Sequence, residues 1–191
     1  MTDTPAICVY CGSRDGTDPA YAAEAEALGR GLAERGWQLV YGAGDVGLMG
    51  RVARAAQAAG GETMGVIPTH LLDLEVGKRD LTRFVVTETM HERKKVMFMN
   101  AHAVVVLPGG AGSLDEFFEV LTWRQLGLHD KPILLVNVGG FWDPLIALID
   151  RVIDEGFAAG SLAGFVQAVP DAEAALSRLG DLLEARTSAT E

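Results

Sequence analysis

The chain has 191 residues, of which 49% are apolar, 22% are charged and 7% are aromatic. This composition is typical of one globular domain with a sizeable core, and it excludes a chain that is disordered throughout. Acidic residues outnumber basic ones by 26 to 16, which gives a net charge of −10. Such an acidic chain has no general attraction for nucleic acid or anionic membranes, so an anionic ligand has to be small and held locally.

No membrane segment and no signal peptide are expected. The longest apolar runs, Ala103–Leu107 and Pro132–Val136, are much shorter than the roughly 18 residues that a membrane helix requires. The first five residues are polar and are followed directly by a strand-like run, which is not the pattern of a signal peptide. We therefore expect a cytoplasmic protein.

Strand-like and helix-like segments alternate along the chain. Strands are expected at 6–11, 37–41, 63–67, 83–87, 103–107, 132–136 and 165–169. Helices are expected at 19–35, 48–59, 89–100, 113–127, 142–155 and 171–184, with an irregular stretch over 68–81 and a frayed tail over 185–191. The alternation predicts a doubly wound, Rossmann-like α/β fold, in which helices cover both faces of one parallel sheet. The whole chain, 1–191, is expected to be a single domain that binds ligands beyond the carboxyl ends of its strands.

Helix boundaries are marked by residues with a clear physical role. Asp18 is expected to cap the first helix, with Pro19 as its first residue and Gly36 as its end. Thr89 and Glu92 have the spacing of a capping box at the start of the helix that follows the fourth strand.

The two cysteines, Cys8 and Cys11, have the C-x-x-C spacing of a redox or metal motif. Zinc would need further ligands, and neither a second cysteine pair nor a pair of closely spaced histidines is present. In a strand, the two cysteines would lie roughly 10 Å apart and on opposite faces, which is too far for a disulfide. We therefore interpret both as small buried residues and expect no metal site.

The segment Gly42–Gly47 matches G-x-G-x-x-G between a strand and a helix. This pattern is typical of NAD or FAD binding, but here it lies in the second strand–helix unit, and no acidic residue ends the next strand. A tight turn that lets helix and strand pack closely explains the same glycines, and this is the interpretation we favour.

A second glycine loop, Pro108–Gly112, joins an apolar strand to the helix that begins at Ser113. Its glycines would let the backbone approach a ligand, and the N-terminus of the helix favours negative charge, so the loop predicts a phosphate site. No lysine follows the last glycine, which excludes a Walker loop. A monophosphate therefore fits better than a triphosphate.

Glu116 follows this loop by about one helical turn. One interpretation is structural, because Ser113 and Glu116 have the spacing of a capping box. The other is catalytic: a rise of ~6 Å from Gly112 is comparable to the reach from a 5′-phosphate to the anomeric carbon of ribose. A carboxylate there could stabilise an oxocarbenium centre and activate water. The residues alone leave both interpretations open.

The charged run His91–Lys95 opens the helix after the fourth strand. A solvated helix face is the usual explanation of such a run. It nevertheless lies at the same end of the sheet as the glycine loops, where its cations could help to hold a phosphorylated sugar.

Together these features resemble the LOG ("Lonely guy") family of cytokinin riboside 5′-monophosphate phosphoribohydrolases. The family hallmark P-G-G-x-G-T-x-x-E is matched by Pro108–Glu116, with serine for threonine, and M-H-x-R-K is present as Met90–Lys94. Further matching stretches are Cys11–Ser13, Gly47–Gly50 and Thr122–Pro132. The resemblance spans nearly the whole chain.

The resemblance implies hydrolysis of the N-glycosidic bond of adenosine-type 5′-monophosphates, such as AMP and isopentenyl-AMP, to free base and ribose 5-phosphate. It implies a homodimer or a larger assembly of dimers, and no cofactor is required. Carried over by position, Arg93 and Glu116 would be the catalytic pair. The substrate-binding residues would be Glu75, Lys94, Gly109, Gly110, Ala111, Gly112, Ser113, Leu114, Asp115 and Thr122.

Two other functions are compatible with the same fold. One is a nucleotide-binding or sensing protein without catalysis, and the other is an NAD-dependent oxidoreductase that uses Gly42–Gly47. Within that segment, Ala43 replaces a glycine of the family, and a positive φ at this position would strain the loop.

Overall fold

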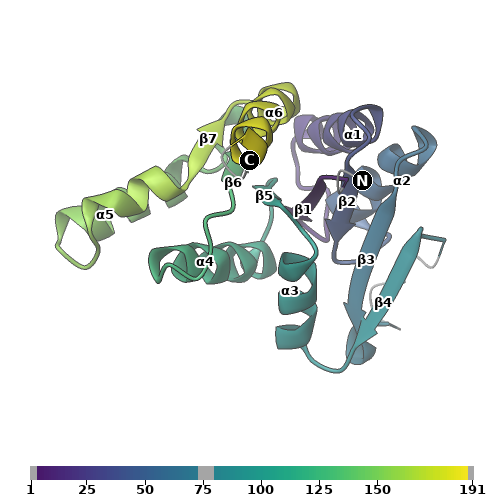
Figure 1. Cartoon of the computed structure of the whole chain (residues 1–191), viewed down its shortest axis with the longest axis horizontal. Helices are drawn as coiled ribbons and strands as arrows, with labels where there is room; N and C mark the ends of the chain where they lie inside the picture. Colours follow the sequence, from purple (N-terminus) through teal and green to yellow (C-terminus); the bar gives the residue numbers. More distant parts are fainter. Residues whose placement is uncertain (1–3, 73–79, 189–191) are drawn as a thin grey trace.

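Parallel strands form a single sheet at the centre of the computed structural model, which describes residues 4–72 and 80–188 (Figure 1). The strands are β1 Ala6–Tyr10, β2 Gln38–Tyr41, β3 Thr63–Pro68, β4 Arg83–Thr87, β5 Ala103–Val106, β6 Ile133–Val136 and β7 Gln167–Val169. Their spatial order is β4-β3-β2-β1-β5-β6-β7, and every neighbouring pair is parallel. The chain therefore winds outward from β1 and β5 in opposite directions, which confirms the predicted doubly wound, single-domain fold.

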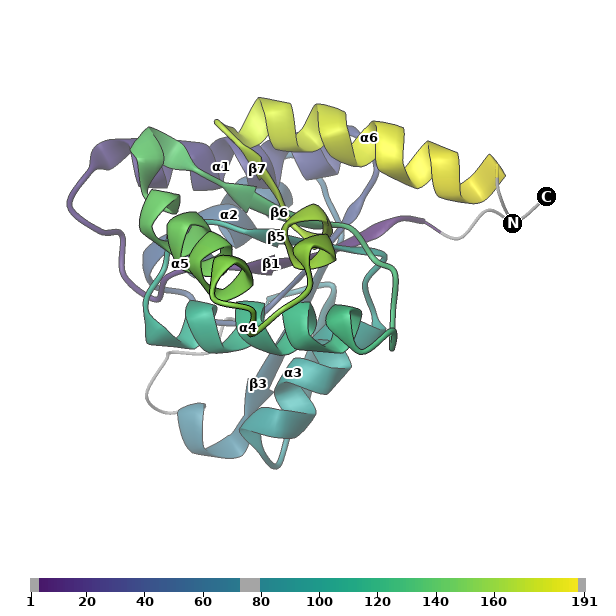
Figure 2. The ribbon, with the colours of Figure 1, turned by 90° about the vertical axis from the view of Figure 1, so that its left-hand side faces the viewer.

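Helices cover both faces of the sheet (Figure 2). On one face lie α1 Pro19–Glu34, α2 Gly47–Ala58 and α6 Ala172–Ser188, and on the other lie α3 Met90–Met99, α4 Ala111–Gln125 and α5 Asp143–Asp154. Short 3-10 turns are formed by Thr69–Leu71, Val138–Gly140 and Gly160–Phe165. Among the described residues, no helix is both long and apolar enough to span a membrane.

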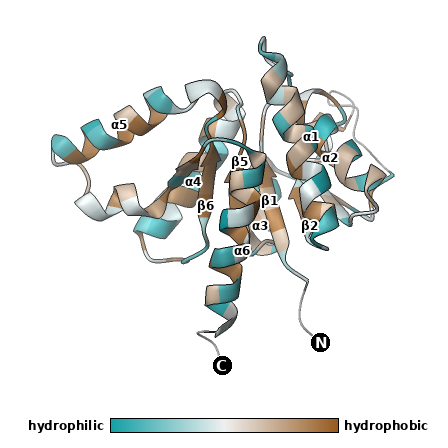
Figure 3. Ribbon diagram, turned by 90° about the horizontal axis from the view of Figure 1, so that it is seen from above, coloured by the Kyte–Doolittle hydropathy of each residue, from teal (hydrophilic) through white to brown (hydrophobic). Residues whose placement is uncertain are grey.

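The strands divide the core into two layers because successive side chains point to opposite faces. Ile7 and Val9 pack with α1, α2 and α6, whereas Cys8 and Tyr10 pack with α3, α4 and α5. The apolar residues follow this division, with hydrophobic strands in the middle and mixed helices outside (Figure 3). Burial on both faces explains why the strands are apolar throughout their length.

The predicted helix caps are confirmed. The Asp18 side chain accepts a hydrogen bond of 2.8 Å from the N–H of Ala20, and Pro19 is the first residue of α1. Gly36, just beyond that helix, has a φ of 69°. Thr89 and Glu92 form the expected capping box at the start of α3.

Both cysteines are free and buried, and they belong to the cores on opposite faces, as expected. Cys11 lies just after β1 rather than within it. Burial, and next the negative charge of Glu116, raise the pKa of both thiols far above its ordinary value. Among the described residues, no group of three His, Cys, Asp or Glu side chains could hold a metal ion.

Two segments near the C-terminus differ from expectation. The last strand begins at Gln167 rather than Phe165, because Gly160–Phe165 forms a 3-10 turn in which the Phe165 ring lies 5.3 Å from the Arg124 guanidinium. Helix α6 continues to Ser188, although a frayed tail was expected from residue 185. An ion pair of 2.7 Å between Arg186 and Asp130 fastens its last turn to the rest of the molecule.

Candidate active site

Two loops meet at the point where the strand order reverses. One follows β1 and the other follows β5, and these neighbouring strands send their connections to opposite faces of the sheet. The Gly12 N–H donates a hydrogen bond of 3.0 Å to the carbonyl oxygen of Pro108. A Cβ on Gly12 would lie 2.9 Å from the Arg14 carbonyl oxygen, so the course of the loop after β1 depends on glycine, whereas its distance of 3.5 Å from Gly109 Cα would be an ordinary contact.

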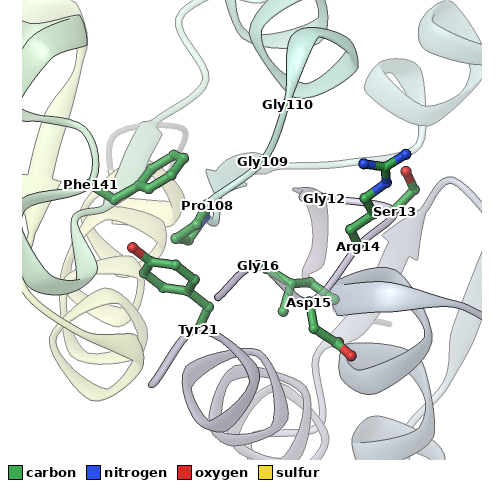
Figure 4. A pocket seen from close by; sticks show the side chains of 11 residues that line it. Gly12, Ser13, Arg14, Asp15, Gly16, Tyr21, Pro108, Gly109, Gly110 and Phe141 are labelled. Atoms are coloured by element: carbon green, nitrogen blue, oxygen red, sulfur yellow. The ribbon is translucent and has the colours of Figure 1, made fainter. Parts of the chain in front are cut away.

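Two adjoining cavities open beside these loops. The smaller, of about 170 Å³, is lined by Cys11, Gly12, Ser13, Met49, Met90, Arg93, Gly110, Ala111, Gly112, Ser113 and Glu116. The larger, of about 450 Å³, is lined by Gly12, Ser13, Arg14, Asp15, Gly16, Tyr21, Leu48, Pro108, Gly109, Gly110 and Phe141 (Figure 4). They share Gly12, Ser13 and Gly110, so the N-terminus of α4 lies between them.

Helix α4 presents its N-terminus to both cavities. It begins at Ala111 with Gly110 as N-cap, and no side chain caps it. The N–H groups of the first helical turn have no acceptor within the helix, and the helix dipole makes this end positive. Side chains on Gly110 and Gly112 would meet nothing within 4 Å, so the backbone here is open to a ligand.

The capping-box interpretation of Ser113 and Glu116 is wrong. Because α4 begins two residues earlier than expected, Ser113 is the third helical residue rather than the cap. Its side chain is buried beside Gly109, where an added Cβ would lie 2.1 Å from Ser113 Oγ. Both Ser113 and Glu116 line the smaller cavity.

Glu116 is a buried acidic residue, 9% exposed, in the second turn of α4. Glu116 and Cys11 both line the smaller cavity, and after burial the negative charge of Glu116 is the next cause of the raised pKa of Cys11. Arg93 has the opposite influence on the same thiol, which places an anion and a cation around one small space.

Arg93 is 5% exposed and is held by two backbone carbonyls. Its Nε donates to the Val66 oxygen at 3.1 Å, and its Nη2 donates to the Gly42 oxygen at 2.8 Å. His91 and Lys95 of the same charged run are exposed, so the solvated-face interpretation holds for them and not for Arg93.

Lys94 is also buried, but it joins α3 to α4 rather than facing a cavity. Its Nζ lies 2.9 Å from Asp115 Oδ2 and 3.0 Å from Glu119 Oε2. Burial alone would lower the pKa of Lys94, but hydrogen bonds to the two carboxylates outweigh it, and the pKa is raised. The structure therefore pairs two of the predicted substrate-binding residues, Lys94 and Asp115, with each other.

The remaining predicted site residues divide into three groups. Gly109 and Gly110 line the larger cavity, and Ala111 and Gly112 line the smaller one. Leu114 packs against the core, and Thr122 is exposed further along α4, so neither lines a cavity. Glu75 lies outside the described residues.

The loop Gly42–Gly47 is used for close packing, as the favoured interpretation predicted. A Cβ on Gly47, whose φ is 59°, would lie 2.3 Å from the Ser13 carbonyl carbon. A Cβ on Gly42 would lie 2.0 Å from Arg93 Nη2. Ala43 has a φ of 60°, the only positive value at a non-glycine residue within the described part of the chain, which confirms the expected strain in this loop.

Sequence reasoning did not assign Ser13, Met49 and Met90 to the site, although all three line the smaller cavity. Each lies in a stretch that matches the family, but none is spaced from other residues in a pattern typical of catalysis or ligand binding. Their positions could have indicated a place in the site, because all three follow the carboxyl ends of strands or lie at the start of a helix there. Fold and site together define a Rossmann-like α/β protein with a partly enclosed site at the switch point of its sheet.

Comparison with known proteins identifies the family. A family model described as "Possible lysine decarboxylase" matches residues 49–179. The cytokinin riboside 5′-monophosphate phosphoribohydrolase LOG of Oryza sativa subsp. japonica is 44% identical over 173 residues, which cover 91% of this chain and 72% of that protein. The enzyme of the same name designated LOG2, of Arabidopsis thaliana, is 41% identical over 173 residues, which cover 91% of this chain and 81% of that protein. The chain therefore belongs to the LOG family.

Solved structures share the fold at lower identity. The Moco carrier protein of Chlamydomonas reinhardtii has a TM-score of 0.73 and 22% identity, and the alignment covers 95% of this chain and 99% of that one. The molybdenum cofactor binding protein of Rippkaea orientalis has a TM-score of 0.73 and 20% identity, and the alignment covers 96% of this chain and 99% of that one. At such identities the likeness shows the fold alone.

Proposed function

We propose that the protein hydrolyses the N-glycosidic bond of adenosine-type 5′-monophosphates, cytokinin riboside 5′-monophosphates among them, to free base and ribose 5-phosphate. One observation carries this proposal. A single small cavity is lined by the N-terminus of a helix, by a buried carboxylate and by a buried guanidinium. The LOG relatives, which are named for this reaction, support it at 41–44% identity.

The phosphate is assigned to the N-terminus of α4. The N–H groups of Ala111, Gly112 and Ser113 and the Ser113 hydroxyl are the donors that a phosphate oxygen would accept from. Glu116 lies one turn further along the same helix, so a ribose attached to this phosphate would bring its anomeric carbon towards the carboxylate.

Glu116 then stabilises the positive charge that develops on the ribose and positions a water molecule. The C1′–N bond breaks with its electron pair going to the base, which takes up a proton, and the water oxygen forms the new bond to C1′. Arg93 is a fixed cation beside this centre that orients the ribose phosphate or assists the departing base. None of these steps requires a metal or an organic cofactor.

We also propose that the protein is a cytoplasmic homodimer. Large apolar side chains are exposed at the ends of the neighbouring helices α3 and α4, where Met99 is 66% and Leu126 is 67% exposed. Both helices lie on the same face of the sheet as the site residues Arg93 and Glu116 (Figure 2). A second copy of the chain would cover these apolar side chains.

The direct test is incubation with AMP and with isopentenyl-AMP, followed by chromatography of the products. Free base and ribose 5-phosphate in equal amounts are expected from the wild type and not from Glu116→Gln. Binding of AMP without release of base would instead indicate a nucleotide-binding protein. A change in nicotinamide absorbance with a reducible substrate would indicate an oxidoreductase.

A further inference from the structure

The motif Gly42–Gly47 is not accounted for by the proposed chemistry, although its first glycine touches the catalytic arginine. Gly42 follows β2, and its carbonyl oxygen accepts a hydrogen bond of 2.8 Å from Arg93 Nη2. Val66 lies in the neighbouring strand β3, and its carbonyl oxygen accepts a hydrogen bond of 3.1 Å from Arg93 Nε. Strand β3 and the residue that follows its neighbour β2 therefore hold two nitrogens of one planar guanidinium.

This pair of hydrogen bonds fixes both the position and the plane of the arginine head group. A guanidinium is rigid and planar, so two acceptors at separate nitrogens leave little freedom for rotation. The acceptors are backbone atoms within β3 and directly after β2, both fixed by the central sheet. Arg93 is thus a preorganised cation rather than a mobile one.

The guanidinium fits only because residue 42 has no side chain. A Cβ on Gly42 would lie 2.0 Å from Arg93 Nη2, 3.0 Å from Arg93 Cζ and 3.2 Å from Met49 Sδ. Gly42 has no positive φ, so its backbone conformation does not itself exclude alanine. The requirement for glycine at this position is therefore steric.

We propose that Gly42 is a positioning residue for the reaction, with its missing side chain and its carbonyl oxygen together setting the place of the Arg93 guanidinium beside Glu116. The effect on catalysis rests on the proposed function. The contact between Gly42 and Arg93 does not, because it belongs to the fold itself. The motif that resembles a dinucleotide-binding loop is here part of the support of an arginine.

The first test is Gly42→Ala, assayed for release of adenine from AMP. The added methyl group would lie 2.0 Å from Nη2 and so force the guanidinium to shift, which we expect to lower kcat at least about tenfold while KM changes less than about threefold. The matched control is Gly31→Ala, whose Cβ would lie 2.2 Å from Leu176 Cδ1 between α1 and α6, remote from the site. That variant is expected to lose thermal stability and to keep kcat.

A double-mutant cycle separates positioning from general destabilisation. Arg93→Lys keeps the charge but has no Nη2, so the methyl group of Gly42→Ala no longer has this atom to displace. In the Arg93→Lys background, Gly42→Ala is expected to lower kcat less than threefold further. Equal losses in both backgrounds, or unchanged kcat in Gly42→Ala with wild-type Arg93, would overturn the proposal.

A second readout needs no activity. Gly42→Ala is expected to lower Tm by several degrees when Arg93 is present and to lower it much less in the Arg93→Ala background, because the clash with the guanidinium is removed and only the 3.2 Å approach to Met49 Sδ remains. If Gly42→Ala does not fold alone, recovery of folding in the double variant supports the proposal, and failure of both overturns it. If the wild type releases no base, the proposed function is contradicted. The coupling between Gly42 and Arg93 can still be measured from the Tm values.

Discussion

Buried charge is the feature that sets the site apart at the scale of single residues. Arg93, Lys94 and Glu116 are almost completely buried, which is costly for charged groups unless they are paired or hydrogen-bonded. Ion pairs with two carboxylates of α4 offset the unfavourable burial of Lys94. Hydrogen bonds to two backbone carbonyls offset part of the unfavourable burial of Arg93. Arg93 and Glu116 line the smaller cavity, and buried charged groups at a cavity are typical of catalytic sites.

Glu116→Gln tests the catalytic carboxylate directly. The variant keeps the size and hydrogen-bonding capacity of the side chain but removes its charge, so turnover of AMP should fall by at least ~100-fold with little change in Tm. The neighbouring Glu119→Gln is the control, because Glu119 contacts Lys94 and lines neither cavity. A large fall in Tm with turnover retained would indicate a structural role for Glu116.

Ala43→Gly tests the strained backbone of the second loop. A left-handed conformation costs alanine about 1–2 kcal/mol, and glycine gives back about 0.5–1 kcal/mol through the greater freedom of the unfolded chain. Because the Ala43 methyl group is fully buried and its loss costs about 0.8 kcal/mol, urea denaturation should show a free energy of unfolding changed by no more than about 0.5 kcal/mol. Ala55→Gly, in the interior of α2, should show a decrease of about 1 kcal/mol, and parallel decreases in both variants would contradict the strain.

The two thiols should be inert in the native protein. Burial and the nearby charge of Glu116 raise the pKa of Cys8 and Cys11, so both remain protonated at pH 8, and the thiolate is the reactive form. Iodoacetamide should therefore modify them only after denaturation, as mass spectrometry can measure. Activity should not depend on reductant, and a reversible oxidative loss that is absent in Cys8→Ala/Cys11→Ala would disprove this expectation.

At the scale of elements, helix α4 combines two tasks. Its first turn offers backbone N–H groups to an anion, and its second turn carries Glu116. Binding energy from the phosphate can therefore align the ribose with the carboxylate, and it should appear in kcat as well as in KM.

The phosphate prediction compares AMP with adenosine. Wild type should hydrolyse AMP with much higher kcat and kcat/KM than adenosine. Ser113→Ala, which removes one hydrogen bond to a charged group, should reduce this preference by about 10–100-fold, whereas Ser113→Thr should leave it nearly unchanged. Steady-state kinetics on both substrates measures this preference. Equal kcat/KM for AMP and adenosine in the wild type would show that the loop has only a structural role.

The positions of most elements could be predicted because their signals are local. Apolar runs, the Asp18 cap and the capping box of Thr89 and Glu92 each depend on a few neighbouring residues. The start of α4 was misplaced because Ser113 has a favourable N-cap side chain, while the real N-cap, Gly110, has none. The residues before Gly110 contact the loop after β1, where Gly12 donates a hydrogen bond to Pro108, and this contact is not visible in a local pattern.

Within the site, residue types could be predicted better than their partners. The sequence motifs led to Arg93, Ser113 and Glu116, which share a cavity. The pairing of Lys94 with Asp115 and Glu119, and of Arg93 with Gly42, depends on how α3 packs against its neighbours. Such contacts between distant segments follow from the fold rather than from spacing along the chain.

At the scale of the whole molecule, the exposed apolar ends of α3 and α4 lead to a prediction on assembly. Met99→Asp combined with Leu126→Asp should shift the protein from dimer to monomer in size-exclusion chromatography with light scattering, because charge in an apolar interface is strongly unfavourable. Phe157→Asp is the control, since Phe157 is 84% exposed beyond the end of α5. A monomeric wild type, or a double variant that remains dimeric, would disprove this interface.

The hydrogen bond between Arg93 and Gly42 also bears on the order in which the protein acquires function as it folds. It joins residues 51 positions apart, and the loops after β1 and β5 are further apart still. Contacts between distant segments carry a large loop-closure entropy and form late relative to local helices. In refolding experiments, the helical circular dichroism signal should therefore return before AMP can bind. A nascent chain that has emerged only as far as β5 would have strands β1 to β5 but would lack Ser113 and Glu116, and so it would have no substrate site.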